Sequence, residues 1–260
     1  VFNEKRGYIL FYKRDIITEM KMKCHICASK QSNFFLKQES YNLFKCELCS
    51  LIYVDPMPSN DELNDFYNHY HKTKQYSDKS ASKVRRAKKR IKTIARFASN
   101  KTLLDVGCNI GAGAEAGRLI GFDTLGIDID DDAIKKAKII FNKNEFECIS
   151  LKDLNLRGRR YGIVYCSEVI EHLPELKNFM KSLYDALDKN GILYITTPDI
   201  GHFSFRNSIE KIKEWNSVRP PEHLMYLNKK SLNMLLLNTG FTKVKFQFSF
   251  KPGIKVAAYK

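Results

Sequence analysis

The spacing of hydrophobic residues predicts a parallel α/β sheet in the second half of the chain. Residues 102–106, 161–168 and 192–196 are short, almost continuously apolar runs, which is typical of strands that are buried on both faces. Between the last two runs, Phe179, Leu183 and Leu187 recur at helical spacing, which indicates an amphipathic helix that covers the sheet. Strands and helices therefore alternate, as in open α/β folds.

A glycine-containing loop follows the first of these runs. Gly107 and Gly111 come directly after it, and a second strand ends at Asp128. Glycines let the backbone approach a ligand closely, and a carboxylate about 20 residues further on can accept hydrogen bonds from both ribose hydroxyls. The layout predicts a nucleoside-containing ligand. A literal G-x-G-x-x-A pattern at residues 111–116 leaves a nicotinamide dinucleotide as the alternative, although that pattern begins inside the loop and not at the end of the strand.

The string Asp105-x-Gly107-x-x-x-Gly111 resembles the D-x-G-x-x-x-G signature of class I methyltransferases that use S-adenosyl-L-methionine. Asn109 stands where many members carry glycine, and asparagine is the residue other than glycine that best tolerates a positive φ. The resemblance implies an α/β fold with a Rossmann-like, seven-stranded methyltransferase sheet. It also implies that the cofactor is held by Asp105, Gly107, Asn109, Gly111, Asp128, Ser167, Tyr70 and Tyr76, with Leu151 or Asp153 beside the adenine.

Later segments extend this resemblance over residues 80–260. The string E-V-I-E-H-L-P at residues 168–174 is similar to one methyltransferase branch that acts on sugars, quinones and RNA ends. Residues 221–227, a helix near 231–239 and strands at 242–250 and 254–259 look like the C-terminal end of that branch. Between them, residues 200–221 carry Phe203, Phe205 and Trp215, which either line a substrate pocket or pack in the core.

Four cysteines near the start of the chain predict a metal site. Cys24-x2-Cys27 and Cys46-x2-Cys49 have the spacing of a zinc ribbon, with short strands expected at residues 32–36 and 41–45. Four thiolates close the coordination shell, so the zinc is expected to be structural. Disulfides are the alternative, but unpaired cysteines elsewhere in the chain favour a cytoplasmic protein. Such ribbons resemble the N-terminal part of bacterial sugar methyltransferases, where they lie beside the active site.

These patterns divide the chain into an N-terminal extension and zinc ribbon (1–60), linker helices (61–100) and a methyltransferase domain (101–260). In the linker, Val84, Ala87 and Ile91 form an apolar stripe, and the opposite face is basic. With a net charge of +15, this favours an anionic partner, either RNA or a nucleotide-linked sugar. A solvated helix explains the same charges equally well. No apolar run approaches the ~20 residues that span a membrane.

Two carboxylates and two imidazoles are the candidates for the chemistry. Glu168, Glu171 and His172 have a spacing that can place all three on one face of a helical turn, and His223 lies farther along the chain. A neutral imidazole is suited to removing a proton from an acceptor near pH 7. The set also resembles the magnesium site of RNA 2′-O-methyltransferases, so a catalytic Mg²⁺ is the alternative to metal-free base catalysis.

Three functions follow from these patterns. The first is methyl transfer from S-adenosyl-L-methionine to a sugar or related small molecule of surface-glycan or secondary metabolism, which rests on the ribbon followed by the methyltransferase domain. The second is RNA 2′-O-methylation, which rests on the basic helix and the Glu/His set. The third is a binding module that keeps the fold without the activity, although the intact glycine loop and Asp128 argue against it.

Overall fold

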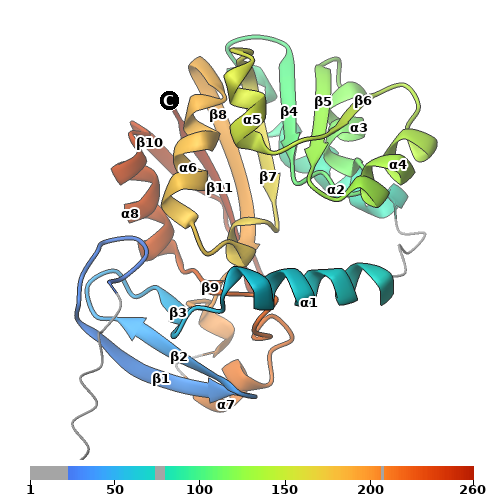
Figure 1. The fold of residues 1–260 in the computed structure, drawn as a ribbon. Helices are drawn as coiled ribbons and strands as arrows, with labels where there is room; N and C mark the ends of the chain where they lie inside the picture. Colours follow the sequence, from blue (N-terminus) through green and yellow to red (C-terminus); the bar gives the residue numbers. More distant parts are fainter. Residues whose placement is uncertain (1–22, 74–79, 206–207) are drawn as a thin grey trace, which may run out of the picture.

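The main body of the protein is one seven-stranded sheet with helices on both faces (Figure 1). The computed structural model describes residues 23–73, 80–205 and 208–260, without the side chains of 67–73. The strand order is β10-β11-β8-β7-β4-β5-β6. The strands are β4 (Thr102–Val106), β5 (Asp123–Asp128), β6 (Glu145–Cys148), β7 (Tyr161–Ser167), β8 (Leu187–Pro198), β10 (Lys243–Phe246) and β11 (Gly253–Tyr259). This arrangement confirms the expected methyltransferase fold.

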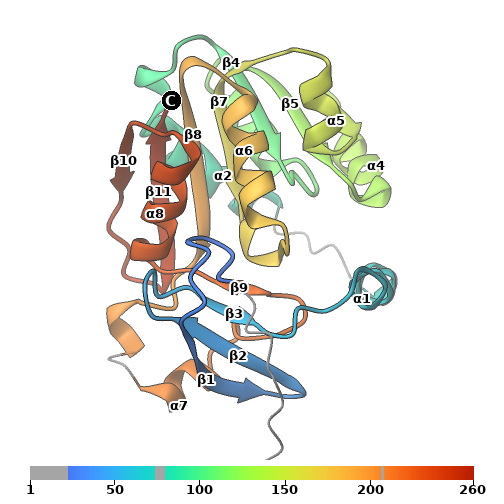
Figure 2. The ribbon, with the colours of Figure 1, turned by 60° about the vertical axis from the view of Figure 1, so that its left-hand side comes forward.

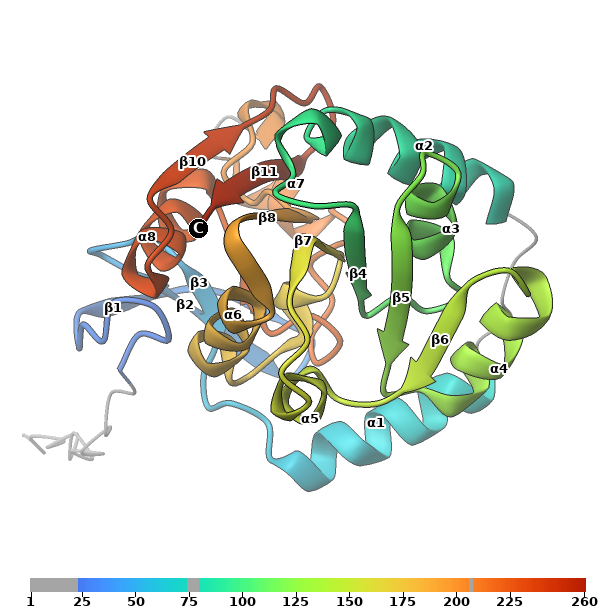
Figure 3. The ribbon, with the colours of Figure 1, turned by 90° about the horizontal axis from the view of Figure 1, so that it is seen from above.

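The five strands from β8 to β6 are parallel, whereas β11 runs antiparallel to β8 and β10 antiparallel to β11. Helices α2 and α3 pack on one face, and α5, α6 and α8 pack on the other (Figure 3). The helices are α2 (Ser80–Lys92), α3 (Ala112–Arg118), α4 (Asp131–Ile140), α5 (Leu151–Leu156), α6 (Leu176–Asp185), α7 (Ile209–Lys213) and α8 (Lys229–Thr239). The order in which successive strands are added to the sheet reverses at β4, which places a ligand crevice at the carboxyl ends of β4 and β7.

Alternate side chains of the central strands enter different cores. In β7, Ile163 and Tyr165 pack toward α2, whereas Val164 and Cys166 pack toward α6. All four are buried, which explains why the sequence shows an apolar run without polar alternation. The predicted strands at residues 102–106 and 161–168 are thereby confirmed to within one residue.

The cysteine-rich segment forms a second, four-stranded sheet of order β1-β2-β3-β9 (Figure 2). Its strands are β1 (Ser32–Gln38), β2 (Tyr41–Cys46), β3 (Ile52–Val54) and β9 (Met225–Tyr226). The two ribbon strands expected from the sequence are present. The fourth strand was not expected, because it comes from the opposite end of the chain. The ribbon and the methyltransferase body thus share a sheet.

Helix α1 (Asn60–Thr73) runs from the ribbon across the end of the main sheet (Figure 1). The short 3₁₀ segments are Ala95–Phe97, Ile170–His172 and Phe203–Phe205. Within the described residues, no helix is both long and apolar enough to cross a lipid bilayer.

Two strand boundaries differ from the expectation. The run at residues 192–196 is the centre of a longer strand, β8, because its first residues also pair with β7. The strand expected at 242–250 ends at Phe246, where its pairing with β11 stops. Beyond it, Phe248 and Phe250 are exposed and Pro252 lacks the N–H that a paired strand needs.

Gly111→Ala is expected to lower the free energy of unfolding by about 3 kcal/mol, because the new Cβ is strained at positive φ and overpacks the core. Gly111 has a φ of +84°, and a Cβ there would lie 2.5 Å from the ring of Phe146. Gly121 is the matched control: its φ is +85°, with nothing within 4 Å of an added Cβ. Gly121→Ala should cost about 1 kcal/mol in urea unfolding. Equal losses in the two variants would show that the Phe146 contact does not matter.

Candidate active site

A cavity of about 1,280 Å³ opens at the carboxyl ends of β4, β5 and β7. Its floor contains Gly107, Asp128 and Ser167, while Asn60 and Asn64 of α1 line it from above. The cavity therefore lies where the strand order reverses, which is the usual ligand crevice of an open α/β sheet.

The glycine loop is held from beneath by Asp105. This carboxylate is 3% exposed, and its Oδ2 accepts a hydrogen bond of 2.8 Å from the backbone N–H of Ala114. A Cβ at Gly113 would lie 2.5 Å from the same carboxylate, so only glycine fits there. Burial raises the pKa of Asp105 to about 7. Asp105 therefore ties the end of β4 to the start of α3.

Asp128 faces the cavity from the end of β5. Its Oδ2 accepts a hydrogen bond from the backbone N–H of Asn109 (2.8 Å), and its Oδ1 accepts one from that of Asp130 (3.1 Å). A carboxylate has about four acceptor positions, so each oxygen keeps one for a further donor. Asn109 has a φ of +50°, which turns its N–H toward Asp128. The carboxylate is thus oriented to receive two hydroxyl groups, as the diol of a ribose would supply.

The other residues expected at the cofactor are placed as follows. Leu151 and Ser167 line the cavity. Asp153 does not line it, because its side chain bonds Ser150 at the N-terminus of α5 (2.6 Å). Tyr76 lies outside the described residues, and so does the side chain of Tyr70.

Arg90 is a site residue that sequence analysis missed. Its Nη1 donates hydrogen bonds of 3.2 Å to the hydroxyls of Tyr165 and Ser167, beside the glycine loop. With Lys83 and Arg86 it forms a row along one face of α2 that lines the cavity. The signal was present in the sequence, since positions 83, 86 and 90 share a helix face, but the surrounding lysines and arginines hid it.

The four candidates for the chemistry separate into two pairs. Glu168 and His172 line the cavity, whereas Glu171 and His223 are buried behind them. The expected single helical face is wrong: Glu168 has a φ of +58°, and a 3₁₀ turn follows it. The carboxylate of Glu168 accepts a hydrogen bond from Thr196 (2.8 Å), and that of Glu171 accepts one from Thr197 (2.9 Å).

The two imidazoles are fixed by backbone carbonyls. His172 Nδ1 bonds the carbonyl of Glu222 (2.7 Å), and His223 Nδ1 bonds that of Ser217 (2.8 Å). Because a carbonyl only accepts, both Nδ1 atoms carry the proton, and Nε2 is the basic nitrogen of each neutral ring. The rings meet edge to face, with centroids 4.6 Å apart.

Burial determines the charge of Glu171 and His223, which we call the rear pair. It lowers the pKa of His223 to about 3, with His172 and Arg219 adding to the shift. It raises the pKa of Glu171 to about 8, with repulsion from Glu168 adding to it. At neutral pH both groups are therefore uncharged, which avoids leaving an unpaired buried charge.

Glu171, His172 and His223 each present a ligand atom within 4.8 Å of the other two, but Glu168 is not part of this group. Two imidazoles and one carboxylate are not the oxygen-rich set that Mg²⁺ prefers. Moreover, Nε2 of His223 already lies 3.3 Å from Nη2 of Arg219, which also pairs with Glu222. The predicted magnesium site therefore does not fit these residues.

The four ribbon cysteines converge in two matching turns. The Sγ atoms of Cys24 and Cys49 are 3.4 Å apart, as are those of Cys27 and Cys46, and all four lie within 4.8 Å of one another. In each turn the first cysteine's carbonyl accepts the N–H four residues on, from Ala28 or Ser50. Tetrahedral zinc with bonds of about 2.3 Å places its sulfurs about 3.8 Å apart, so the cluster fits that ion.

Comparisons with known proteins agree with this geometry. Residues 67–245 match the model of a family described as a methyltransferase domain. A ubiquinone biosynthesis O-methyltransferase of Hydrogenovibrio crunogenus is 27% identical over 177 residues, which are 64% of this chain and 73% of that protein.

Solved structures share the fold. A SAM-dependent methyltransferase from Archaeoglobus fulgidus superimposes with a TM-score of 0.54 at 20% identity, over 68% of this chain and 94% of that one. The N-terminal domain of EvdMO1, crystallised in the presence of SAH and D-fucose, superimposes with a TM-score of 0.52 at 16% identity, over 71% of this chain and 84% of that one. The family match, the sheet order and the glycine loop lead to one conclusion: the chain belongs to the methyltransferase domain family and is a class I enzyme that uses S-adenosyl-L-methionine.

Proposed function

We propose that the protein methylates a sugar or a related polar small molecule that carries an anionic group, such as a nucleotide-linked sugar. The observation that carries this proposal is the set of polar side chains that line the cavity together with His172. Amides come from α1 and α6 (Asn60, Asn64 and Asn178), one carboxylate from Glu175 directly before α6, and cations from α2 (Lys83 and Arg86). A polyhydroxylated, negatively charged acceptor matches this set in hydrogen bonding and in charge.

Two relatives bear on the choice of acceptor. The first relative acts, as its name says, in the biosynthesis of ubiquinone. The EvdMO1 domain was crystallised in the presence of D-fucose, which supports a sugar as the acceptor.

The cofactor would lie along the floor of the cavity. We propose that Asp128 binds the ribose diol, that Gly107 and Asn109 let the backbone approach the methionine part, and that Leu151 covers the adenine. Arg90 would bind the methionine carboxylate, because guanidinium pairs well with carboxylate and, among the described residues, the hydrogen bonds of its side chain go to the hydroxyls of Tyr165 and Ser167. When bound, S-adenosyl-L-methionine supplies a methyl group on a good leaving group, so orientation contributes much of the rate.

We propose His172 as the general base, because it combines a fixed Nδ1–H with a place in the cavity wall. The proton of an acceptor hydroxyl would pass to its Nε2 while the new bond to the methyl carbon forms and the carbon–sulfur bond breaks. Glu168 is placed to orient the acceptor by a hydrogen bond. Glu171 and His223 would act from behind by holding the His172 ring.

The ribbon cysteines are proposed to bind one structural zinc ion, because four thiolates leave no position for a substrate. The matching turns around Cys24 and Cys46, with their repeated backbone hydrogen bonds, support this assignment.

RNA is the second candidate acceptor. The observation that favours it is the outward face of α2, where Arg85, Lys88 and Lys89 lie beside the cationic row of the cavity. A phosphate backbone along that face would bind with a strong salt dependence.

Asp128→Ala is expected to weaken binding of S-adenosylhomocysteine about 10- to 100-fold, because two hydrogen bonds to a charged group are lost. Calorimetric titration measures this directly. Asp132→Ala, which removes an exposed carboxylate from the first turn of α4, should leave the affinity unchanged. Unchanged affinity in Asp128→Ala would remove the ribose assignment.

Metal analysis of the purified protein should find about one zinc per chain, held by sulfur. Cys46→Ser should lose the zinc and lower the melting temperature, because a structural zinc contributes to folding. Cys148→Ser changes an exposed cysteine outside the cluster and should retain both. A metal-free wild-type protein with four reduced thiols would contradict the zinc assignment.

A panel of acceptors decides the substrate class. Transfer of a labelled methyl group is expected to nucleotide-linked sugars, and His172→Gln should lower kcat about 100- to 10,000-fold, the usual range for a positioned base. His202→Gln alters a buried histidine outside the cavity wall and should keep most of the activity. Transfer to short RNA alone, lost at raised salt, would establish the second candidate instead.

A further inference from the structure

The third ribbon strand is joined to the segment that carries His223. Ile52 and Tyr53 pair with Tyr226 and Met225, and the N–H of Val54 donates to the carbonyl of Leu224 (3.1 Å). The paired residues are all at most 3% exposed. This pairing is therefore part of the core and not a surface contact.

A second connection between the ribbon and this segment starts at the cysteine turn that precedes β3. The carbonyl of Ser50, the residue after Cys49, accepts a hydrogen bond of 2.6 Å from the side-chain amide of Asn228. The N–H of Ser50 in turn donates to the carbonyl of Cys46 (2.9 Å). Asn228 also caps α8 through Ser231. With the bond between Val54 and Leu224, the ribbon is therefore attached to both ends of the short segment 224–228.

The same segment fixes the rear pair of the active site. The hydroxyl of Tyr226 donates to the carbonyl of His223 (2.9 Å), and the N–H of Leu224 donates to the carbonyl of Glu171 (2.9 Å). The residue before His223 supplies the carbonyl that holds the ring of His172. The backbone of Glu171 and the ring of His172 are thus both held by the backbone of residues 222–224.

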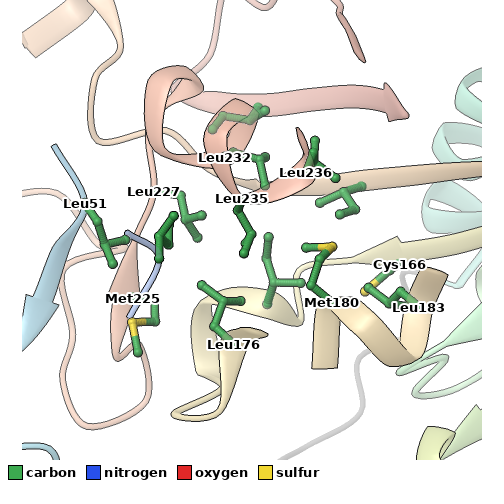
Figure 4. Close-up of a cluster of buried hydrophobic side chains, with 14 of the residues drawn as sticks. Leu51, Cys166, Leu176, Met180, Leu183, Met225, Leu227, Leu232, Leu235 and Leu236 are labelled. Atoms are coloured by element: carbon green, nitrogen blue, oxygen red, sulfur yellow. The ribbon is translucent and has the colours of Figure 1, made fainter. Parts of the chain in front are cut away.

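Hydrophobic packing continues across this junction. Figure 4 shows Leu51 of the ribbon in one cluster with Met225, Leu227 and Leu232. Strand β3 has only three residues and β9 only two, and strands this short are marginal without support from their flanks. The cysteine turn directly before β3 is the support on the ribbon side.

We propose that the zinc ribbon is a positioning device for the acceptor site. The cysteine turn, held by the metal, fixes the position of β3. Strand β3 fixes the position of β9 by pairing with it, and β9 in turn fixes the positions of His223 and of the Glu171 backbone. Tyr226 is the positioning residue that links β9 to His223. This inference rests on the proposed zinc site and on the proposed base catalysis, and it assigns the ribbon a task beyond its own folding.

The test follows the imidazole of His223 by ¹H–¹⁵N spectra of the histidine rings in the full-length, metal-loaded protein, assigned with His223→Gln. In the wild type, the ring is expected as the Nδ1–H tautomer alone. Tyr226→Phe leaves the backbone carbonyl of His223 without its hydrogen bond, so the ring signals of His223 should shift while those of His202 stay unchanged. Tyr53→Phe is the matched control, since it removes a buried hydroxyl from the same sheet that bonds Ser32 and not His223.

Removal of the metal by a chelator should shift the His223 signals in the same way, while the Kd for S-adenosylhomocysteine stays within about twofold. An unchanged His223 spectrum in Tyr226→Phe, or after metal removal that loosens the ribbon, would overturn the proposal. Loss of S-adenosylhomocysteine binding on metal removal would also overturn it, because the ribbon would then support the whole fold. If the protein holds no zinc, the zinc assignment fails, and Tyr226→Phe still tests the link to His223.

Discussion

The reversal of strand order at β4 is the constraint on which the rest of the site depends. The chain leaves β4 toward β5 on one side and returns to β7 on the other, so the loops after β4 and β7 turn away from each other. The gap between them has to be lined by backbone that bends sharply. Gly107, Asn109 and Glu168 all adopt positive φ there, at the places where the ligand groups are presented. The strain is located at the cavity and supported by the buried carboxylate of Asp105 beneath it.

The second half of the site is closed by parts of the chain that lie far apart in sequence. The loop after β7 supplies Glu171 and His172, and the segment before β9 supplies His223. These two loops contact each other through the hydrogen bond between Leu224 and Glu171. Neither loop is long enough to order itself, and the ribbon supplies the missing sheet partner. The cysteine-rich sheet and the segment that carries His223 are therefore one structural unit.

How far the sequence predicts this structure depends on the range of the interactions. The apolar run at 102–106 and the cap of α8 act locally, so their elements could be predicted. The cysteine spacing also predicted a cluster, because four thiols at that spacing have few other arrangements. Strand β9 could not be predicted, since two residues carry no periodicity and its partner lies more than 170 positions earlier in the chain. Arg90 was missed for a related reason. Which lysine or arginine enters the cavity depends on the rotation of α2 about its own axis as it packs on the sheet.

The charge states of Glu171 and His223 follow from how deeply they are buried and not from their residue types. Glu171 is a buried carboxylate, and burial, with repulsion from Glu168 adding to it, raises its pKa to about 8. His223 lies deeper than His172 and beside Arg219, which keeps its ring neutral. This uncharged pair lies behind Glu168 and His172, while Lys83, Arg86 and Arg90 of α2 line the same cavity. Burial thus separates the two residues of this set that line the cavity from the two that lie behind them, and the division of roles proposed above follows that difference in depth.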